Sequence, residues 1–149
     1  METKEHKRLN DGCLDRINGG YMYYTICDHY EDNVGAIYNL MRMNLEDYTI
    51  EKVCENVRDC DFQGNSIVYS RPESGRRCNI YRFENGESKM EFSCDTLGKD
   101  ALIYRIQCTE DEIFLKVETD AYNVQLIRID THGNIKKYHE YGEWNATSA

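Results

Sequence analysis

The sequence predicts an α+β fold, with N-terminal helices followed by a C-terminal antiparallel β-meander of six to seven strands. Apolar residues recur at helical spacing between residues 34 and 60. After Asp61 they alternate with polar residues, which is the period of a half-buried strand. Short polar connections separate the later runs, as in hairpins. Such a sheet must bury one face, so it could wrap the helices or close into a partial barrel.

The N-terminal third predicts one strand and two helices. Tyr21–Cys27 is aromatic and β-branched and predicts a strand, and the polar residues 28–33 predict a loop. Val34–Met43 carries apolar residues at helical spacing and predicts a helix. Asn44 is expected to cap a second helix over Leu45–Cys60. The apolar stripe of that second helix is Ile50, Val53, Cys54 and Val57.

The rest of the chain predicts strands separated by turn residues. The predicted strands are Ser66–Arg71, Arg77–Glu84, Ser88–Asp95, Ala101–Cys108, Glu112–Thr119, Asn123–Asp130 and Asn134–Tyr141. Asn85-Gly86 lies between two of them and is a strong hairpin signal. In Asn123–Asp130 the apolar positions change from one face to the other, which predicts a bulge or burial on both faces.

Composition excludes several classes of partner. The 149 residues include 27 acidic and 18 basic ones, for a formal net charge of −9. This charge argues against nucleic acid as the main partner and against anionic membrane surfaces. No apolar run approaches the roughly 18 residues of a membrane-spanning helix, so no membrane insertion is expected. An acidic surface instead favours a basic protein partner, through attraction of opposite charges.

Residues 9–20 carry the most specific pattern in the chain. Apolar residues fall on one side of a helix at Leu9, Cys13, Leu14 and Ile17. Gly19-Gly20 follows, and residues without a Cβ tend to end a helix. A short amphipathic helix can dock in an apolar groove, and an extended Gly-Gly fits a narrow protease cleft. The pattern therefore indicates cleavage after Gly20.

This segment resembles the double-glycine leader of bacteriocin-type bacterial precursors, which peptidase-containing ABC transporters export. That family has aliphatic residues four, seven and twelve positions before the cleavage point, where this chain has Ile17, Leu14 and Leu9. The chain departs from the family at Cys13 and Asn10, where Glu and Ser are usual. The resemblance covers residues 1–20 only. It implies that the transporter peptidase domain binds those three residues and cuts at Gly19-Gly20.

The resemblance implies a cleavable leader at 1–20 and a single secreted domain at 21–149, acting as a binding or interaction protein. A second interpretation takes Asn18-Gly19-Gly20 as a tight hairpin turn before the strand Tyr21–Cys27. The chain is then a cytoplasmic acidic binding module, such as an inhibitor, an immunity-type protein or a small-ligand barrel. The two interpretations differ in whether residues 1–20 can be removed without unfolding the chain.

The cysteine count is compatible with export. The chain has seven cysteines, and removal of Cys13 with the leader leaves an even number. These candidate disulfide cysteines are Cys27, Cys54, Cys60, Cys78, Cys94 and Cys108. Six cysteines allow about 15 pairings, among which a sequence cannot choose. The alternative is that they are reduced, buried thiols acting as small apolar residues.

No group of residues predicts catalysis. Cys27-Asp28-His29 brings a thiol, a carboxylate and an imidazole together in sequence, but acidic neighbours raise the pKa of a thiol. Cys54 and Cys60 are too far apart for a zinc knuckle. Residues 130–134 superficially resemble a calcium loop, but a hairpin turn explains them. The sequence therefore predicts a non-catalytic protein without metal or cofactor.

Overall fold

The computed structural model describes residues 15–74, 77–93, 95, 102–120 and 123–139. These residues form strands joined by turns. The strands are β1 Arg16–Asn18, β2 Tyr21–Glu31, β3 Gly35–Asn44, β4 Ile50–Val57, β5 Asp59–Gln63, β6 Ser66–Ser74, β7 Arg77–Glu84, β8 Glu87–Phe92, β9 Leu102–Cys108, β10 Ile113–Asp120, β11 Asn123–Ile129 and β12 Ile135–His139.

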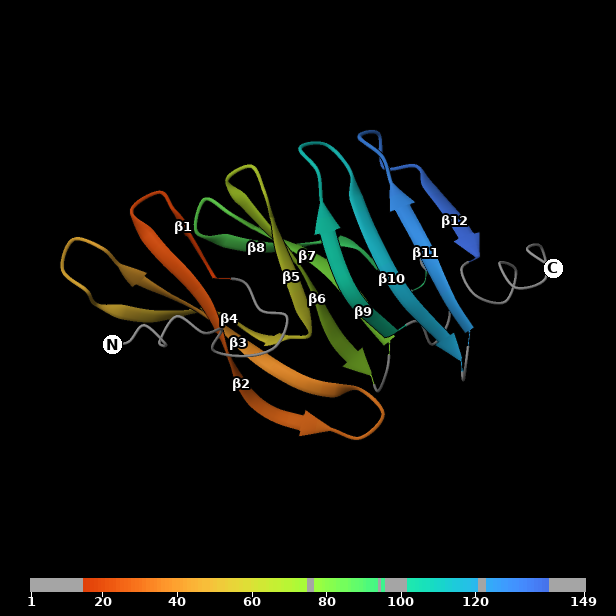
Figure 1. The fold of residues 1–149 in the computed structure, drawn as a ribbon, viewed down its shortest axis with the longest axis horizontal. Helices are drawn as coiled ribbons and strands as arrows, with labels where there is room; N and C mark the ends of the chain where they lie inside the picture. Colours follow the sequence, from red (N-terminus) through yellow and green to blue (C-terminus); the bar gives the residue numbers. More distant parts are fainter. Residues whose placement is uncertain (1–14, 75–76, 94, 96–101, 121–122, 140–149) are drawn as a thin grey trace.

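The strands form three four-stranded antiparallel sheets, each made of consecutive strands. The first sheet is β1–β4, the second β5–β8 and the third β9–β12. The first and third sheets lie at opposite ends of the long axis (Figure 1). The described residues contain no helical element, so the predicted α+β class and its N-terminal helices are wrong. The later strands also divide between two sheets instead of forming one meander or a partial barrel.

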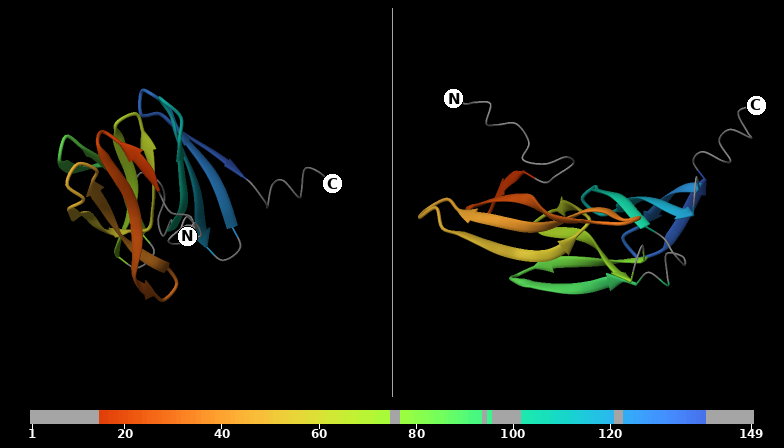
Figure 2. Two further views of the ribbon diagram at one scale, coloured as in Figure 1. Left: turned by 60° about the vertical axis from the view of Figure 1, so that its left-hand side comes forward. Right: turned by 90° about the horizontal axis from the view of Figure 1, so that it is seen from below.

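The second sheet contributes to both hydrophobic core clusters. One cluster combines residues of the first and second sheets, including Leu40, Phe62 and Tyr69. The other combines the second and third sheets, including Val68 and Leu115, and also contains Ile37 of the first sheet. Figure 2 shows the strands of the first and second sheets alongside one another, with the third sheet at the far end. Because β6 supplies residues to both clusters, it is buried on both faces.

The helix predicted over Val34–Met43 is the strand β3, because that strand is also buried on both faces. Ile37 belongs to the core cluster with the third sheet. Tyr38 and Leu40 belong to the cluster with the second sheet. A strand with two buried faces has a nearly continuous apolar run, and such a run does not distinguish a strand from a buried helix.

The helix predicted over Leu45–Cys60 is replaced by a turn, β4 and the start of β5. Leu40 pairs with Cys54, but Tyr38 pairs with Val57, so one extra residue bulges out of β4 between these pairs. The bulge puts consecutive buried positions three residues apart, which imitates helical spacing. Asn44 therefore does not cap a helix, and its side-chain oxygen instead accepts a 2.7 Å hydrogen bond from the Glu46 N–H in the β3–β4 turn.

The other predicted strands are confirmed, with bounds that shift by a few residues. The strand predicted over Tyr21–Cys27 is the first part of β2, which continues through the predicted loop to Glu31. β7 has the predicted bounds Arg77–Glu84. Ile127 and Ile129 are buried and Leu126 is half-buried, so one face of β11 is fully buried and the other only partly.

Gly19-Gly20 forms the turn of the β1–β2 hairpin. Asn18 pairs with Tyr21, which leaves the two glycines as a two-residue loop. Their φ angles are 59° and 84°, and two positive φ angles are typical of a type I′ turn. β1 also touches the second sheet, where the Arg16 guanidinium lies 4.7 Å from the centre of the Phe62 ring. Asn18–Tyr21 therefore has the geometry of the tight hairpin turn that the second interpretation predicts.

Side chains of β5 join the second sheet to the third. Asp59 Oδ2 accepts a 2.7 Å hydrogen bond from the Ile106 N–H, and Asp61 Oδ2 accepts one of 2.7 Å from the Cys108 N–H. Gln63 Nε2 donates to the carbonyls of Thr109 and Glu112, both at 3.1 Å. Alternate residues of a strand point to the same side, so these side chains together bond the backbone of β9 and the loop after it. This joint fixes the third sheet against β5.

Candidate functional site

A groove of about 630 Å³ lies between the β2–β3 hairpin and the third sheet. Three tyrosines, three cations and two carboxylates are among the residues that line it. The lining residues are Tyr30, Gly35, Ala36, Tyr38, Arg58, Asp59, Tyr104, Arg105, Lys116, Glu118 and Val124. A second hollow continues around the β2–β3 turn and shares Tyr30, Gly35, Arg58 and Tyr104. The groove has the size and the mixture of aromatic and polar groups of a ligand site.

Arg58 links the walls of the groove. It lies between β4 and β5, and its Nε donates a 3.2 Å hydrogen bond to the carbonyl of Val34. Its guanidinium carbon is 5.9 Å from the centre of the Tyr104 ring on β9. Gly35 leaves room for this guanidinium, because a Cβ there would lie 3.4 Å from an Arg58 terminal nitrogen. The φ of Gly35 is 104°, which a side-chain-bearing residue rarely adopts.

Asp59 is a buried carboxylate in the groove lining, only 9% exposed. Burial raises the pKa of Asp59 to about 6, although the hydrogen bond from the Ile106 N–H and the charges of Arg105 and Arg58 oppose the rise. A buried carboxylate with a raised pKa in a cleft is a common mark of a functional site. Structural residues can show the same shift, so the groove geometry carries the assignment.

Tyr104 and Tyr30 give the groove aromatic walls. The Tyr104 hydroxyl donates a 3.5 Å hydrogen bond to Glu118 on β10. Tyr30 is 78% exposed although its neighbours in the strand pair closely with β3. Exposed tyrosines supply binding area at a small cost in side-chain entropy.

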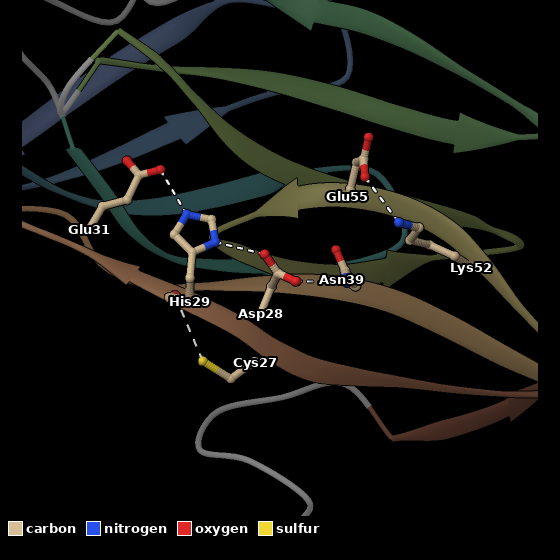
Figure 3. Close-up of polar contacts among 7 residues, drawn as sticks. All are labelled: Cys27, Asp28, His29, Glu31, Asn39, Lys52 and Glu55. Carbon is tan, nitrogen blue, oxygen red and sulfur yellow. Dashed lines mark hydrogen bonds and ion pairs between the residues drawn. The ribbon is translucent and has the colours of Figure 1, made fainter.

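A second polar cluster lies on β2, beside the groove. Asp28 is the extra residue of a β-bulge, and Figure 3 shows its side chain on the same side of the strand as His29 and Glu31. His29 Nδ1 lies 2.7 Å from Asp28 and Nε2 lies 2.9 Å from Glu31. The hydrogen bonds to Glu31 and then Asp28 raise the pKa of His29, because they favour the protonated ring. Asn39 on β3 bonds the other Asp28 oxygen at 3.4 Å.

This cluster does not activate Cys27. The Cys27 side chain lies on the opposite side of the strand from the His29 ring, and its sulfur contacts the His29 carbonyl at 3.8 Å (Figure 3). A nucleophilic thiol needs a base within hydrogen-bond reach, and the imidazole is not in that position. Within the described part of the chain, no group of three or more His, Cys, Asp or Glu residues has the geometry of a metal site.

The predicted leader residues are only partly described. Leu9 and Leu14 lie outside the described residues. Ile17 lies on β1 and is 65% exposed. Gly19 and Gly20 form the adjoining turn, and no heavy atom would lie within 4 Å of a Cβ built on either. The predicted cleavage position therefore lies in an exposed turn beside a three-residue strand.

The candidate disulfide cysteines are spread over the sheets. Cys27, Cys54 and Cys108 carry free thiols, while Cys94 lies outside the described residues. Burial raises the pKa of Cys108 to about 12 and also raises that of Cys54. These two thiols are therefore poor nucleophiles near neutral pH.

The sequence interpretation missed the groove entirely. Its residues come from β2, β3, β5, β9, β10 and β11 and from the junction between β4 and β5. Comparison of the chain with protein-family models, curated proteins and solved structures yields no match. In the residues that the structure describes, no helix is long and apolar enough to span a membrane. The site is therefore argued from its geometry alone.

Proposed function

We propose that this chain is a non-catalytic binding protein and that the groove between the β2–β3 hairpin and the third sheet is its binding surface. The observation that carries the proposal is the buried carboxylate of Asp59 in a groove with exposed aromatic walls. Keeping this charge buried costs stability at neutral pH, although the Ile106 N–H and two arginines offset part of the cost. Local costs of this kind are tolerated mainly where a site needs them.

A thermal-shift screen tests this function. The purified chain is heated with organic anions, neutral compounds, organic cations and short peptides. A ligand at 100 times its dissociation constant stabilises the folded state by about 2.7 kcal/mol, which raises the melting temperature measurably. We expect Tyr30→Ala to weaken the shift caused by a groove ligand, because Tyr30 lines the groove.

Tyr48→Ala is the matched control, since Tyr48 is 68% exposed and lies in the β3–β4 turn. It should leave the shift unchanged. The proposal fails if no class of compound raises the melting temperature. It also fails if both tyrosine variants reduce the shift equally, because the ligand would then bind elsewhere.

Export after cleavage behind Gly20 is our second proposal. It is supported by the leader-like spacing of Leu9, Leu14 and Ile17, by the exposure of Ile17 and by the short pairing of β1. The test is the intact mass of the chain recovered from its native host, from cells and from medium, without reductant. A species starting at Tyr21 in the medium supports export, and its mass reports any disulfides.

Recovery of only the full-length chain, confined to cells, contradicts export. The chain would then be a cytoplasmic binding module with a basic protein as partner. Exposed carboxylates on two turns support such a partner: Glu46, Asp47, Glu84 and Glu87. A basic peptide in the thermal-shift screen would then stabilise the chain, and charge-neutralising variants of those turns would weaken the effect.

A further inference from the structure

Two cations face each other on the third sheet, and neither is held in an ion pair within the described residues. Arg105 on β9 and Lys116 on β10 are directly opposite in the antiparallel register. Directly opposed side chains have Cβ atoms about 5 Å apart, and like charges at that separation destabilise a sheet. Both side chains are exposed. Within the described residues, neither side chain forms a hydrogen bond or an ion pair.

Several other arginines of the described residues do have carboxylate partners. Arg42 lies 2.6 Å from Glu51, Arg82 lies 2.7 Å from Glu91, and Arg128 lies 2.7 Å from Glu112. The chain has 27 acidic residues against 18 basic ones, so an opposed cation pair without a bound carboxylate is unexpected. A departure of this kind from the local rule marks a candidate functional position.

The cation pair borders two hollows. One is the groove, where Asp59 and Glu118 also lie and would repel an anion. The other, of about 260 Å³, is lined by the pair together with Gln107, Phe114, Leu115 and Leu126. Apart from the pair, that second hollow has no charged lining residue. An anion with an apolar body would therefore bind from the side of Phe114 and Leu126.

We propose that Arg105 and Lys116 bind the oxyanion of an organic ligand, a carboxylate or a phosphate, whose apolar body lies against Phe114 and Leu126. A guanidinium donates two parallel hydrogen bonds to such a group, and an ammonium adds a point charge. The oxyanion also removes the repulsion between the two cations. This proposal goes beyond the proposed groove function, because the apolar body of the ligand lies in the second hollow. Net charge does not prevent binding, because charges beyond about 8 Å are largely screened at physiological salt.

Four probes with one ring test the chemistry: phenyl phosphate, benzoate, benzyl alcohol and benzylamine. Each is titrated into the ¹⁵N-labelled chain while amide shifts of Gln107, Lys116 and Leu126 are followed. We expect the two anions to bind with dissociation constants at least tenfold lower than that of the alcohol, as read from the shifts of these amides. The amine should not shift them. The stronger of the two anions identifies phosphate or carboxylate as the source of the oxyanion.

The deciding variant is Arg105→Gln with Lys116→Gln. It should weaken anion binding at least tenfold and raise the melting temperature, because the repulsion is removed. Lys52→Gln with Lys89→Gln changes the net charge equally on exposed side chains outside both hollows, and should change the affinity less than twofold. Equal losses in both double variants would overturn the proposal, since net charge would then explain the binding.

Two further outcomes separate this proposal from the binding function itself. If neutral or cationic compounds shift the amides of Tyr30 and Tyr104 while anions shift nothing, the oxyanion proposal fails and the groove function stands. If the anions bind at the cation pair and Tyr30→Ala has no effect on any ligand, the oxyanion proposal stands and the groove is not the binding surface.

Discussion

At the scale of single residues, the described core contains two polar groups that lower its stability. Ser70 is fully buried on β6, and its hydroxyl has no hydrogen-bond partner in the described part of the chain. Asp59 is buried with a raised pKa. Ser70 allows a substitution that should stabilise the fold, which is unusual for a buried residue.

Ser70→Ala should raise the free energy of unfolding by about 1 kcal/mol, because it removes a buried hydroxyl that forms no hydrogen bond. Urea denaturation measures the change. Tyr69→Phe is the contrasting variant, since the Tyr69 hydroxyl donates a 3.0 Å hydrogen bond to Ser88. It should lower stability by about 1 kcal/mol. A larger loss from Ser70→Ala than from Tyr69→Phe would show that the Ser70 hydroxyl is satisfied.

Asp59 should make stability fall as the pH rises from about 4 to about 6. Its pKa rises on folding from 3.8 to about 6, so in this range the folded state holds more protons than the unfolded state. The loss is about 3 kcal/mol for a rise of roughly two pKa units, and it levels off above pH 6. The stability of wild type minus that of Asp59→Asn, measured by urea denaturation, should follow this curve. A flat difference between pH 4 and 6.5 would contradict the raised pKa.

At the scale of elements, β1 is the least secured strand of the described fold. It pairs only three residues with β2, and one cation–π contact joins it to Phe62. Segments with few buried contacts open most easily. Local opening of this hairpin would present Gly19-Gly20 in extended form, as a peptidase cleft requires.

Gly20→Val should weaken the hairpin more than Gly20→Asn, because asparagine tolerates a positive φ and a β-branched residue does not. We expect Gly20→Val to cost about 1–2 kcal/mol of local stability. Hydrogen exchange at the amides of Tyr21–Tyr23 measures the loss, and the overall melting temperature should change little. If both variants lose protection equally, the turn does not depend on the positive φ. Peptidase processing makes a different prediction, since both variants should block cleavage.

At the scale of the whole molecule, the second sheet couples the two core clusters. Ile67 and Val68 are neighbours on β6 and point into different clusters. A substitution that destabilises either cluster should therefore also destabilise the other. The chain is expected to unfold in one cooperative transition.

Ile67→Ala should lower the free energy of unfolding by about 3 kcal/mol and Val68→Ala by about 2 kcal/mol, from lost burial and the cavities that remain. In each variant the midpoints from near-UV and far-UV circular dichroism should coincide. Ile50→Ala is the control, because Ile50 is 57% exposed and its loss should change stability by less than about 0.5 kcal/mol. Separate transitions for the two signals would show that the clusters unfold independently.

Local patterns predicted most of the strands from Ser66 onward. Alternation and short polar turns are properties of neighbouring residues, and so they can be recognised in a sequence. The same reasoning failed at β3 and β4. Ile37 and Leu40 face different core clusters, and a bulge separates Cys54 from Val57, so helical spacing arose without a helix.

The binding site could not be predicted in this way. Tyr30, Arg58 and Tyr104 are far apart in the chain and share no motif. Net charge pointed to a basic partner, but the third sheet places Arg105 opposite Lys116. The sum of charges is a property of composition, whereas a binding site depends on which charges become neighbours.

The sequence by itself determined the turns and strand periods of this protein. Asn85-Gly86 has positive φ angles in the turn that joins β7 to β8, as its residue types require. Only the tertiary structure decided which strands are buried on both faces, how Asp59 and Asp61 join β5 to β9, and where the cations meet. The physical reason is the sequence separation over which each property is determined. Turn geometry depends on φ preferences of adjacent residues, while burial and charge pairing depend on residues that folding alone brings together.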